Sequence, residues 1–136
     1  MSFFDDEKSI DFLKKILKQS IIERKSKVSN LDVLTIMNNT KNSMKFYYKH
    51  GLLSMLVELA KNDLNTSEIL TFFVSMDMHI NLIHEIYQRG LLNKMQEEIK
   101  NLEVKSEKEE KLLCLWIKLA GKICVNSKIR EKIFAS

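Results

Sequence analysis

Histidine and cysteine are the residue types in this 136-residue chain best suited to hold a metal ion or to act as a nucleophile. The histidines are His50, His79 and His84, and no two of them are four residues apart, the spacing that places two ligands on one face of a helix. Cys114 and Cys124 have no histidine or second cysteine at metal-ligand spacing, and no basic cluster that would activate a thiol. The sequence therefore predicts no metal site, no catalytic cysteine and no cofactor.

Longer motifs that carry chemistry are also missing from the sequence. It contains no phosphate-binding loop, no GxSxG nucleophile motif and no dinucleotide-binding fingerprint. The alternating charges at 103–111 are interpreted as a solvated connection that leads into a helix, with a capping-box pattern from Ser106 to Glu109. We therefore expect that the protein is not an enzyme.

The cysteines and the N-terminus indicate the compartment. Cys114 and Cys124 lie ten residues apart in one predicted helix, several turns from each other, so they cannot form a disulfide there. Free cysteines are typical of reducing compartments. The first residues, MSFFDDEKS, are acidic and lack the long apolar core of a signal peptide, and no apolar run is long enough to span a membrane. We expect an intracellular protein, cytoplasmic or nuclear, without a membrane partner.

Composition identifies the elements that must position these side chains. The chain has 45% apolar and 29% charged residues, which is ordinary for a globular protein, but only three glycines and no proline. Sheet-rich folds depend on turns that use glycine and proline heavily, so the sequence predicts an all-α fold. Apolar periodicity and capping residues place helices at 5–26, 30–38, 42–50, 52–62, 67–77, 80–89, 91–103 and 107–124, with a last one from Ser127.

Three segments of the chain repeat one pattern. They are NSMKFYYKHG at 42–51, NLIHEIYQRG at 81–90 and NSKIREKIFA at 126–135. Each begins with an asparagine and the first two end with a glycine, which gives the repeat positions Asn42, Asn81, Asn126, Gly51 and Gly90. The copies start 39 and 45 residues apart, and repeats of two or three helices have periods of about 40–47 residues. We expect each glycine to take the left-handed conformation that reverses the chain after a short helix.

These residues resemble the armadillo family of helical repeats. GLLSMLVELA at 51–60 is similar to the second helix of an armadillo repeat, and LCLWIKLAGKICVNSKIREKIFA at 113–135 to a third helix that continues into the next unit. The resemblance implies a right-handed α–α superhelix of about two full repeats with partial flanking units. The single domain would comprise a capping helix at 5–26, a partial repeat at 30–39, repeats at 42–78 and 81–124, and the start of another at 127–136.

The resemblance also implies a function, a non-catalytic scaffold whose third helices line a groove for a partner protein or peptide. Candidate partner-binding residues on these helices are Phe73, Asp77, Lys111, Trp116, Lys118 and Lys122. The repeat alignment places Lys118 at the position of Phe73 and Leu34, so that the groove would change from apolar to basic and attract an acidic segment. Two alternatives stay open: the lysines form a plain solvent-facing stripe, and Trp116 is a core residue.

The end of the sequence and the charge of the chain suggest further hypotheses about its partners. The last repeat has no second helix, so we expect either the N-terminal piece of a larger scaffold or self-association through an open C-terminal end. A nucleic-acid-binding domain would use the basic residues of 14–27 and 111–122. The net charge is only +4 with the signs interspersed, so a protein partner is expected rather than nucleic acid. A compact helical bundle with an apolar peptide groove is the second alternative.

Overall fold

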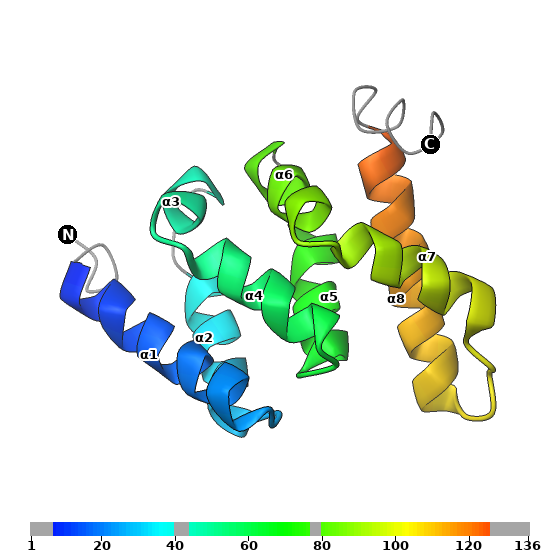
Figure 1. The fold of residues 1–136 in the computed structure, drawn as a ribbon, viewed down its shortest axis with the longest axis horizontal. Helices are drawn as coiled ribbons and strands as arrows, with labels where there is room; N and C mark the ends of the chain where they lie inside the picture. Colours follow the sequence, from blue (N-terminus) through cyan, green and yellow to red (C-terminus); the bar gives the residue numbers. More distant parts are fainter. Residues whose placement is uncertain (1–6, 40–43, 77–79, 126–136) are drawn as a thin grey trace.

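The structure, a computed structural model, describes residues 7–39, 44–76 and 80–125, and every element in them is a helix (Figure 1). The helices are α1 (Glu7–Glu23), α2 (Val28–Asn39), α3 (Met44–Lys49), α4 (Leu52–Lys61), α5 (Thr66–Ser75), α6 (Ile80–Gln88), α7 (Leu91–Asn101) and α8 (Glu107–Cys124). The prediction of an all-α fold is confirmed. The helix expected from Ser127, together with Asn42, Asp77 and Asn126, lies outside the described residues.

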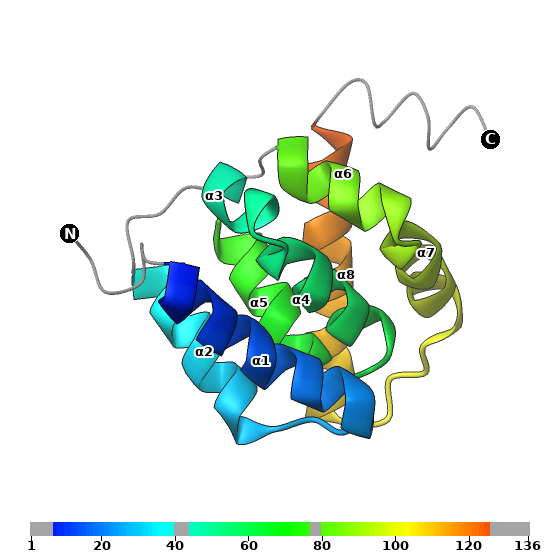
Figure 2. The same cartoon turned by 60° about the vertical axis from the view of Figure 1, so that its left-hand side comes forward.

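The helices pack in a regular order along the chain. Each of the first five contacts the helix three places further on, so that α1 meets α4, α2 meets α5, α3 meets α6, α4 meets α7 and α5 meets α8. In Figure 1, α1, α4 and α7 form one row, α2, α5 and α8 form a second row, and α3 and α6 lie together at one edge; Figure 2 shows the same neighbours from another side. The contact between α3 and α6 includes an edge-to-face pair of Tyr48 and His84, with ring centroids 6.2 Å apart.

No single helix is surrounded by all the others. α4 has the most neighbours, since it contacts α1, α3, α5, α6 and α7. The principal contacts of α2 are instead with α1 and α5, and those of α8 are with α5 and α7. The described helices therefore extend in rows from α1 to α8 rather than enclosing one central helix.

The two glycine corners have the same backbone geometry. Gly51 and Gly90 both have φ of 79°, in the left-handed region, and α4 and α7 begin at the next residue. In both corners the glycine N–H donates to the carbonyl three residues earlier, to Tyr48 at 3.1 Å and to Tyr87 at 3.4 Å. The prediction that these glycines reverse the chain after a short helix is confirmed.

The ends of α1 and α4 also share one backbone conformation. Each helix ends with a non-glycine residue in the left-handed region, Arg24 with φ of 54° and Asp63 with φ of 63°. In both, the left-handed residue donates its N–H three residues back and the next residue donates five residues back, which is the Schellman pattern. Arg24 and Asp63 are 39 residues apart, as Gly51 and Gly90 are. The same separation therefore relates the ends of α1 and α4 and the two glycine corners.

Buried apolar side chains form one continuous core that draws on all eight helices. Its fully buried members include Trp116, Tyr47 and Phe73. The Tyr47 hydroxyl donates a 2.9 Å hydrogen bond to the Met37 carbonyl, so its polar end is satisfied inside the core. Full burial of a Leu- or Phe-sized side chain contributes about 1.5–3 kcal/mol, so this core is the main source of stability.

Ion pairs cross between the helix groups α3–α5 and α6–α8. Arg89, which directly follows α6, forms ion pairs with Glu85 of α6 at 2.7 Å and with Glu58 of α4 at 3.3 Å. Lys94 of α7 bridges Asp63 at 2.9 Å. The hydrogen bond to Glu85, with a further one to Glu58, outweighs the effect of burial and raises the pKa of Arg89. Arg89 thus links the end of α6 to α4, and Lys94 links α7 to the turn after α4.

Candidate functional site

The predicted partner-binding residues lie mainly on α8, and the start of this helix is well defined. The Ser106 hydroxyl accepts the Glu109 N–H at 3.4 Å, as the capping-box pattern predicted. Glu107, Glu109 and Glu110 occupy the first turn, where acidic side chains interact favourably with the helix dipole. The cap therefore defines where α8 begins, and its contacts with α5 and α7 decide which of its faces is buried.

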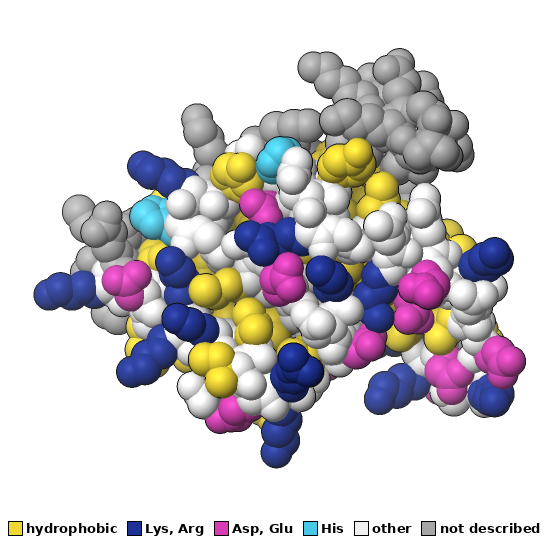
Figure 3. All heavy atoms as spheres, viewed as in Figure 1, with side chains coloured by type: hydrophobic (Ala, Val, Ile, Leu, Met, Phe, Trp, Pro, Cys, Tyr) yellow, Lys and Arg dark blue, Asp and Glu magenta, His cyan; other side chains and the backbone are white. Residues whose placement is uncertain are grey.

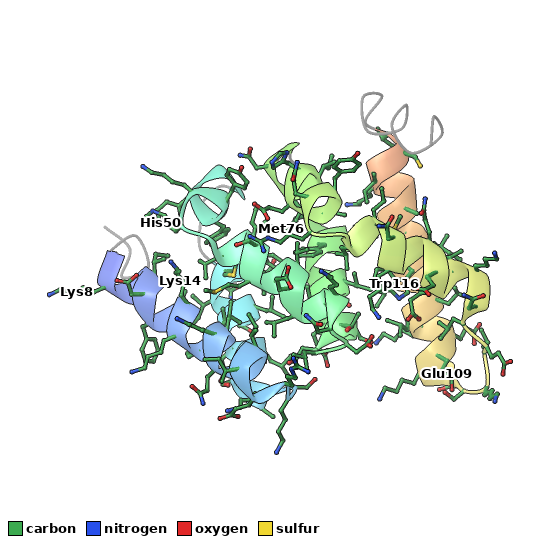
Figure 4. The ribbon with its side chains drawn as sticks, viewed as in Figure 1. Lys8, Lys14, His50, Met76, Glu109 and Trp116 are labelled. Carbon is green, nitrogen blue, oxygen red and sulfur yellow. The ribbon has the colours of Figure 1, made fainter. Side chains whose placement is uncertain are left out.

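Two of the predicted site residues are in the core. Phe73 on α5 and Trp116 on α8 are both 0% exposed, so neither side chain is accessible to a partner, contrary to the expectation. Trp116 is labelled in Figure 4. The alternative of a core role for Trp116 is the one that fits. Its indole Nε1 is buried and has no hydrogen-bond acceptor among the residues that the structure describes.

The alignment of Lys118 with Phe73 and Leu34 is also wrong. Leu34 and Phe73 are buried, whereas Lys118 is exposed and the next residue, Leu119, is 0% exposed. A shift of one residue turns a side chain by 100° around a helix, and apolar spacing alone leaves such a shift undetermined. The 45-residue offset came from the match of 81–90 with 126–135, and it does not carry over to the burial pattern of α8. A groove that changes from apolar to basic through these three positions is therefore not formed.

Lys122 has a structural contact. Its ammonium group donates a 3.0 Å hydrogen bond to the Met76 carbonyl, directly after α5, and the side chain is half-buried. Met76 is labelled in Figure 4. A cation at a helix C-terminus satisfies a free carbonyl and interacts favourably with the helix dipole. Lys122 therefore joins α8 to α5 rather than facing a partner.

An exposed surface remains on α8. Lys111 and Lys118 are both exposed and lie seven residues apart, which places them two turns apart on one face. Between them lie the exposed side chains of Cys114 and Ile117, and Ile117 is 52% exposed. We call these four residues the α8 surface. Its lysines were predicted from the sequence but Ile117 was not, because an isoleucine in an apolar helix is normally a core residue.

A second candidate is a groove of about 330 Å³ between α1 and the start of α2. We call it the α1–α2 groove; its lining residues are Phe12, Lys15, Ile16, Gln19, Lys27 and Ser29. Phe12 is 61% exposed, which is unusual for a phenylalanine. No pattern in the sequence predicts this groove, since it depends on how α2 folds back against α1.

The charges at the groove are mostly basic. Lys27 pairs with Glu23 at 2.5 Å, and Gln19 donates to the same carboxylate at 2.6 Å. The hydrogen bonds from Lys27 and then Gln19 lower the pKa of Glu23. Lys15 is exposed and has no ion pair among the described residues. Residues 8–29 contain seven basic and two acidic side chains, and Figure 3 shows apolar atoms ringed by basic ones on this side of the molecule.

The connection between α7 and α8 has the opposite charge. A hollow of about 490 Å³ there is lined by Glu97, Glu98, Asn101, Leu102, Glu103, Lys105 and Glu109. Val104 in the same connection is 51% exposed. The acidic side chains are visible near α7 and the start of α8 in Figure 3. The molecule therefore has a basic apolar surface at α1 and an acidic one at the α7–α8 connection.

Within 7–39, 44–76 and 80–125, no three histidine, cysteine or acidic side chains come together as metal ligands. None of the described helices combines the length and apolar content needed to cross a bilayer. No family model, curated protein or solved structure matches the chain. The armadillo resemblance therefore rests on the sequence segments at 51–60 and 113–135 alone.

Proposed function

We propose that this chain is a non-catalytic, armadillo-like scaffold that binds a partner protein through the α8 surface. The contacts between helices three places apart support a repeat architecture, as does the 39-residue period shared by the glycine corners and the ends of α1 and α4. In such an architecture the third helices are α2, α5 and α8, and repeated units stack to bury each other's apolar faces. The resulting superhelix would present one face of these helices to partners.

The observation that carries the proposal is the exposure of Ile117. It is 52% exposed on a helix whose neighbouring residues Trp116 and Leu119 turn into the core and are fully buried. Lys111 and Lys118 flank it in sequence, and both are exposed. An apolar side chain bordered by cations suits a partner segment that combines apolar and acidic residues.

Affinity capture with the intact chain tests this function. We expect Ile117→Asp and the double variant Lys111→Glu, Lys118→Glu to lose the captured partner, because each removes one kind of complementarity. The matched control is Lys61→Glu, Lys100→Glu, which makes the same charge change at exposed lysines of α4 and α7. Equal recovery by all variants would reject the α8 surface as the binding site.

Nucleic acid is the second candidate, and the excess of basic residues over 8–29 favours it. Phosphate-driven binding weakens by about 10³–10⁵ between low and physiological salt when six to ten phosphates are contacted. Fluorescence anisotropy with labelled single- and double-stranded oligonucleotides measures this directly. Binding that is abolished by Lys14→Glu, Lys18→Glu and falls steeply with salt would favour nucleic acid over a protein partner.

A further inference from the structure

The α1–α2 groove has the chemistry to receive an acidic segment with an apolar side chain. Phe12 and Ile16 give it an apolar lining, and Lys15 supplies positive charge beside it, whereas the Lys27 ammonium is already paired with Glu23. Ser29 lies in the first turn of α2, where backbone N–H groups have no intrahelical acceptor and favour an anion. Its hydroxyl makes no hydrogen bond within the described residues.

The chain itself carries a segment of that chemistry. The α7–α8 connection exposes Val104 beside Glu103, and residues 97–110 contain six acidic and three basic side chains. Glu103 is 76% exposed, and its ion pair with Lys105 is equally open to solvent. Such a surface pair is worth little, so the Glu103 carboxylate can exchange it for another cation without a large cost.

We propose that the α7–α8 connection of a second copy docks in the α1–α2 groove. Val104 would insert between Phe12 and Ile16, and Glu103 would approach Lys15. The groove volume of about 330 Å³ is sufficient for one such side chain with its neighbouring backbone. This contact is independent of the α8 surface and does not rest on the proposed scaffold function.

The positions of the two surfaces determine the kind of assembly. α1 lies at one end of the helix rows and the α7–α8 connection at the other (Figure 1). The contact therefore joins two different surfaces, and its repetition produces head-to-tail chains rather than a closed two-fold dimer. A single connection in a shallow groove buries little area, which makes the association weak and reversible. Its charge component makes it weaken as salt rises.

Sedimentation velocity of the full chain tests the docking. Between about 10 μM and 1 mM protein, the range in which small interfaces associate, we expect the average mass to rise with concentration at low salt. The groove variant Phe12→Asp, Lys15→Glu and the connection variant Glu103→Lys, Val104→Lys should each stay monomeric. Ile22→Asp is the matched control, since Ile22 is 65% exposed on α1 but does not line the groove, and it should associate as the unmodified chain does.

Mixing the two monomeric variants separates this model from other modes of self-association. Each retains one intact surface, so one groove and one connection remain compatible, and a one-to-one mixture should form dimers and nothing larger. Circular dichroism checks that each variant keeps its helices. A monomeric unmodified chain at the highest concentration, association that persists in either variant alone, or a mixture that stays monomeric would each overturn the proposal.

Discussion

The side-chain amide of Asn30, fully buried in α2, donates a 2.8 Å hydrogen bond to the side-chain oxygen of Asn65. The same oxygen accepts the Lys27 N–H at 3.2 Å, and the Asn65 N–H donates to the Ser26 hydroxyl at 2.9 Å. Asn30 also exchanges hydrogen bonds with the buried Ser20. This network connects the turn between α1 and α2 to the turn between α4 and α5, and so holds the first two helices against the next group.

Replacement of Asn65 by alanine should destabilise the fold by about 2–3 kcal/mol. The change removes the acceptor of two donors, and an unsatisfied buried donor costs about 1–3 kcal/mol. Alanine is also strained at the left-handed φ of 51°. Urea unfolding measures the effect, and Asn65→Gly should recover about 1 kcal/mol of it because glycine accepts this φ. Asn62→Ala is the control; its exposed side chain bonds only the Glu58 carbonyl, so a loss as large there would contradict the role assigned to the network.

Replacement by alanine should have opposite effects on stability at Gly90 and at Gly121, because their backbone conformations differ. Gly90 has φ of 79° and nothing within 4 Å of an added Cβ, so Gly90→Ala should cost about 1–2 kcal/mol from backbone strain alone. Gly121 is exposed inside α8 with similar open space, so Gly121→Ala should stabilise the helix by up to about 1 kcal/mol. Thermal unfolding of both variants measures the difference. Equal effects at the two sites would argue against the left-handed corner.

Trp116→Phe should change stability by less than about 1 kcal/mol. The substitution loses buried area and leaves a small void, but it also removes the unsatisfied Nε1 donor, and the two effects oppose each other. Trp116→Ala removes the whole ring and should cost about 3–5 kcal/mol. Chemical denaturation of both variants gives the comparison. A cost for phenylalanine close to that for alanine would show that Nε1 is bonded, for example to a buried water.

Much of the local structure was predictable because it depends on interactions between residues close together in the sequence. All eight described helices were predicted, with differences of a few residues at their ends. Gly51 and Gly90 identified the corners because left-handed backbone there strongly favours glycine. The end of α1 was predicted too late, at residue 26, because Arg24 takes a left-handed conformation that its residue type does not announce.

The surfaces were harder to predict, because they depend on rotation and packing of whole helices. A one-residue error in aligning α8 exchanged the buried Leu119 for the exposed Lys118. Lys122 looked like a free cation, yet Met76 is 46 residues away in sequence and its carbonyl was not a foreseeable partner. Phe12 drew no attention, since its exposure depends on where α2 lies against α1. Tertiary contacts decide each of these cases.

The ion pair between α7 and the end of α4 should make stability sensitive to alkaline pH. Burial acts to lower the pKa of Lys94, but Asp63 at 2.9 Å and Glu98 outweigh it and raise the pKa above the ordinary 10.5. A raised pKa in the folded state means that the folded protein holds this proton more tightly than the unfolded chain does. The stabilisation is therefore complete below the ordinary pKa and is lost as the pH rises through the folded value.

Lys94→Met removes this charge, so the variant should lack the part of the alkaline loss of stability that Lys94 causes. Urea unfolding at about pH 9 and about pH 11.5 measures the free energy of unfolding on both sides of the lysine titration. The unmodified chain should lose more stability between these values than Lys94→Met does, by a modest amount because Asp63 is 73% exposed. Lys100→Met is the control, since Lys100 is exposed on the same helix, and it should keep the full pH dependence. If Lys94→Met and the unmodified chain lose stability in parallel, the pair with Asp63 does not stabilise the interface between α4 and α7.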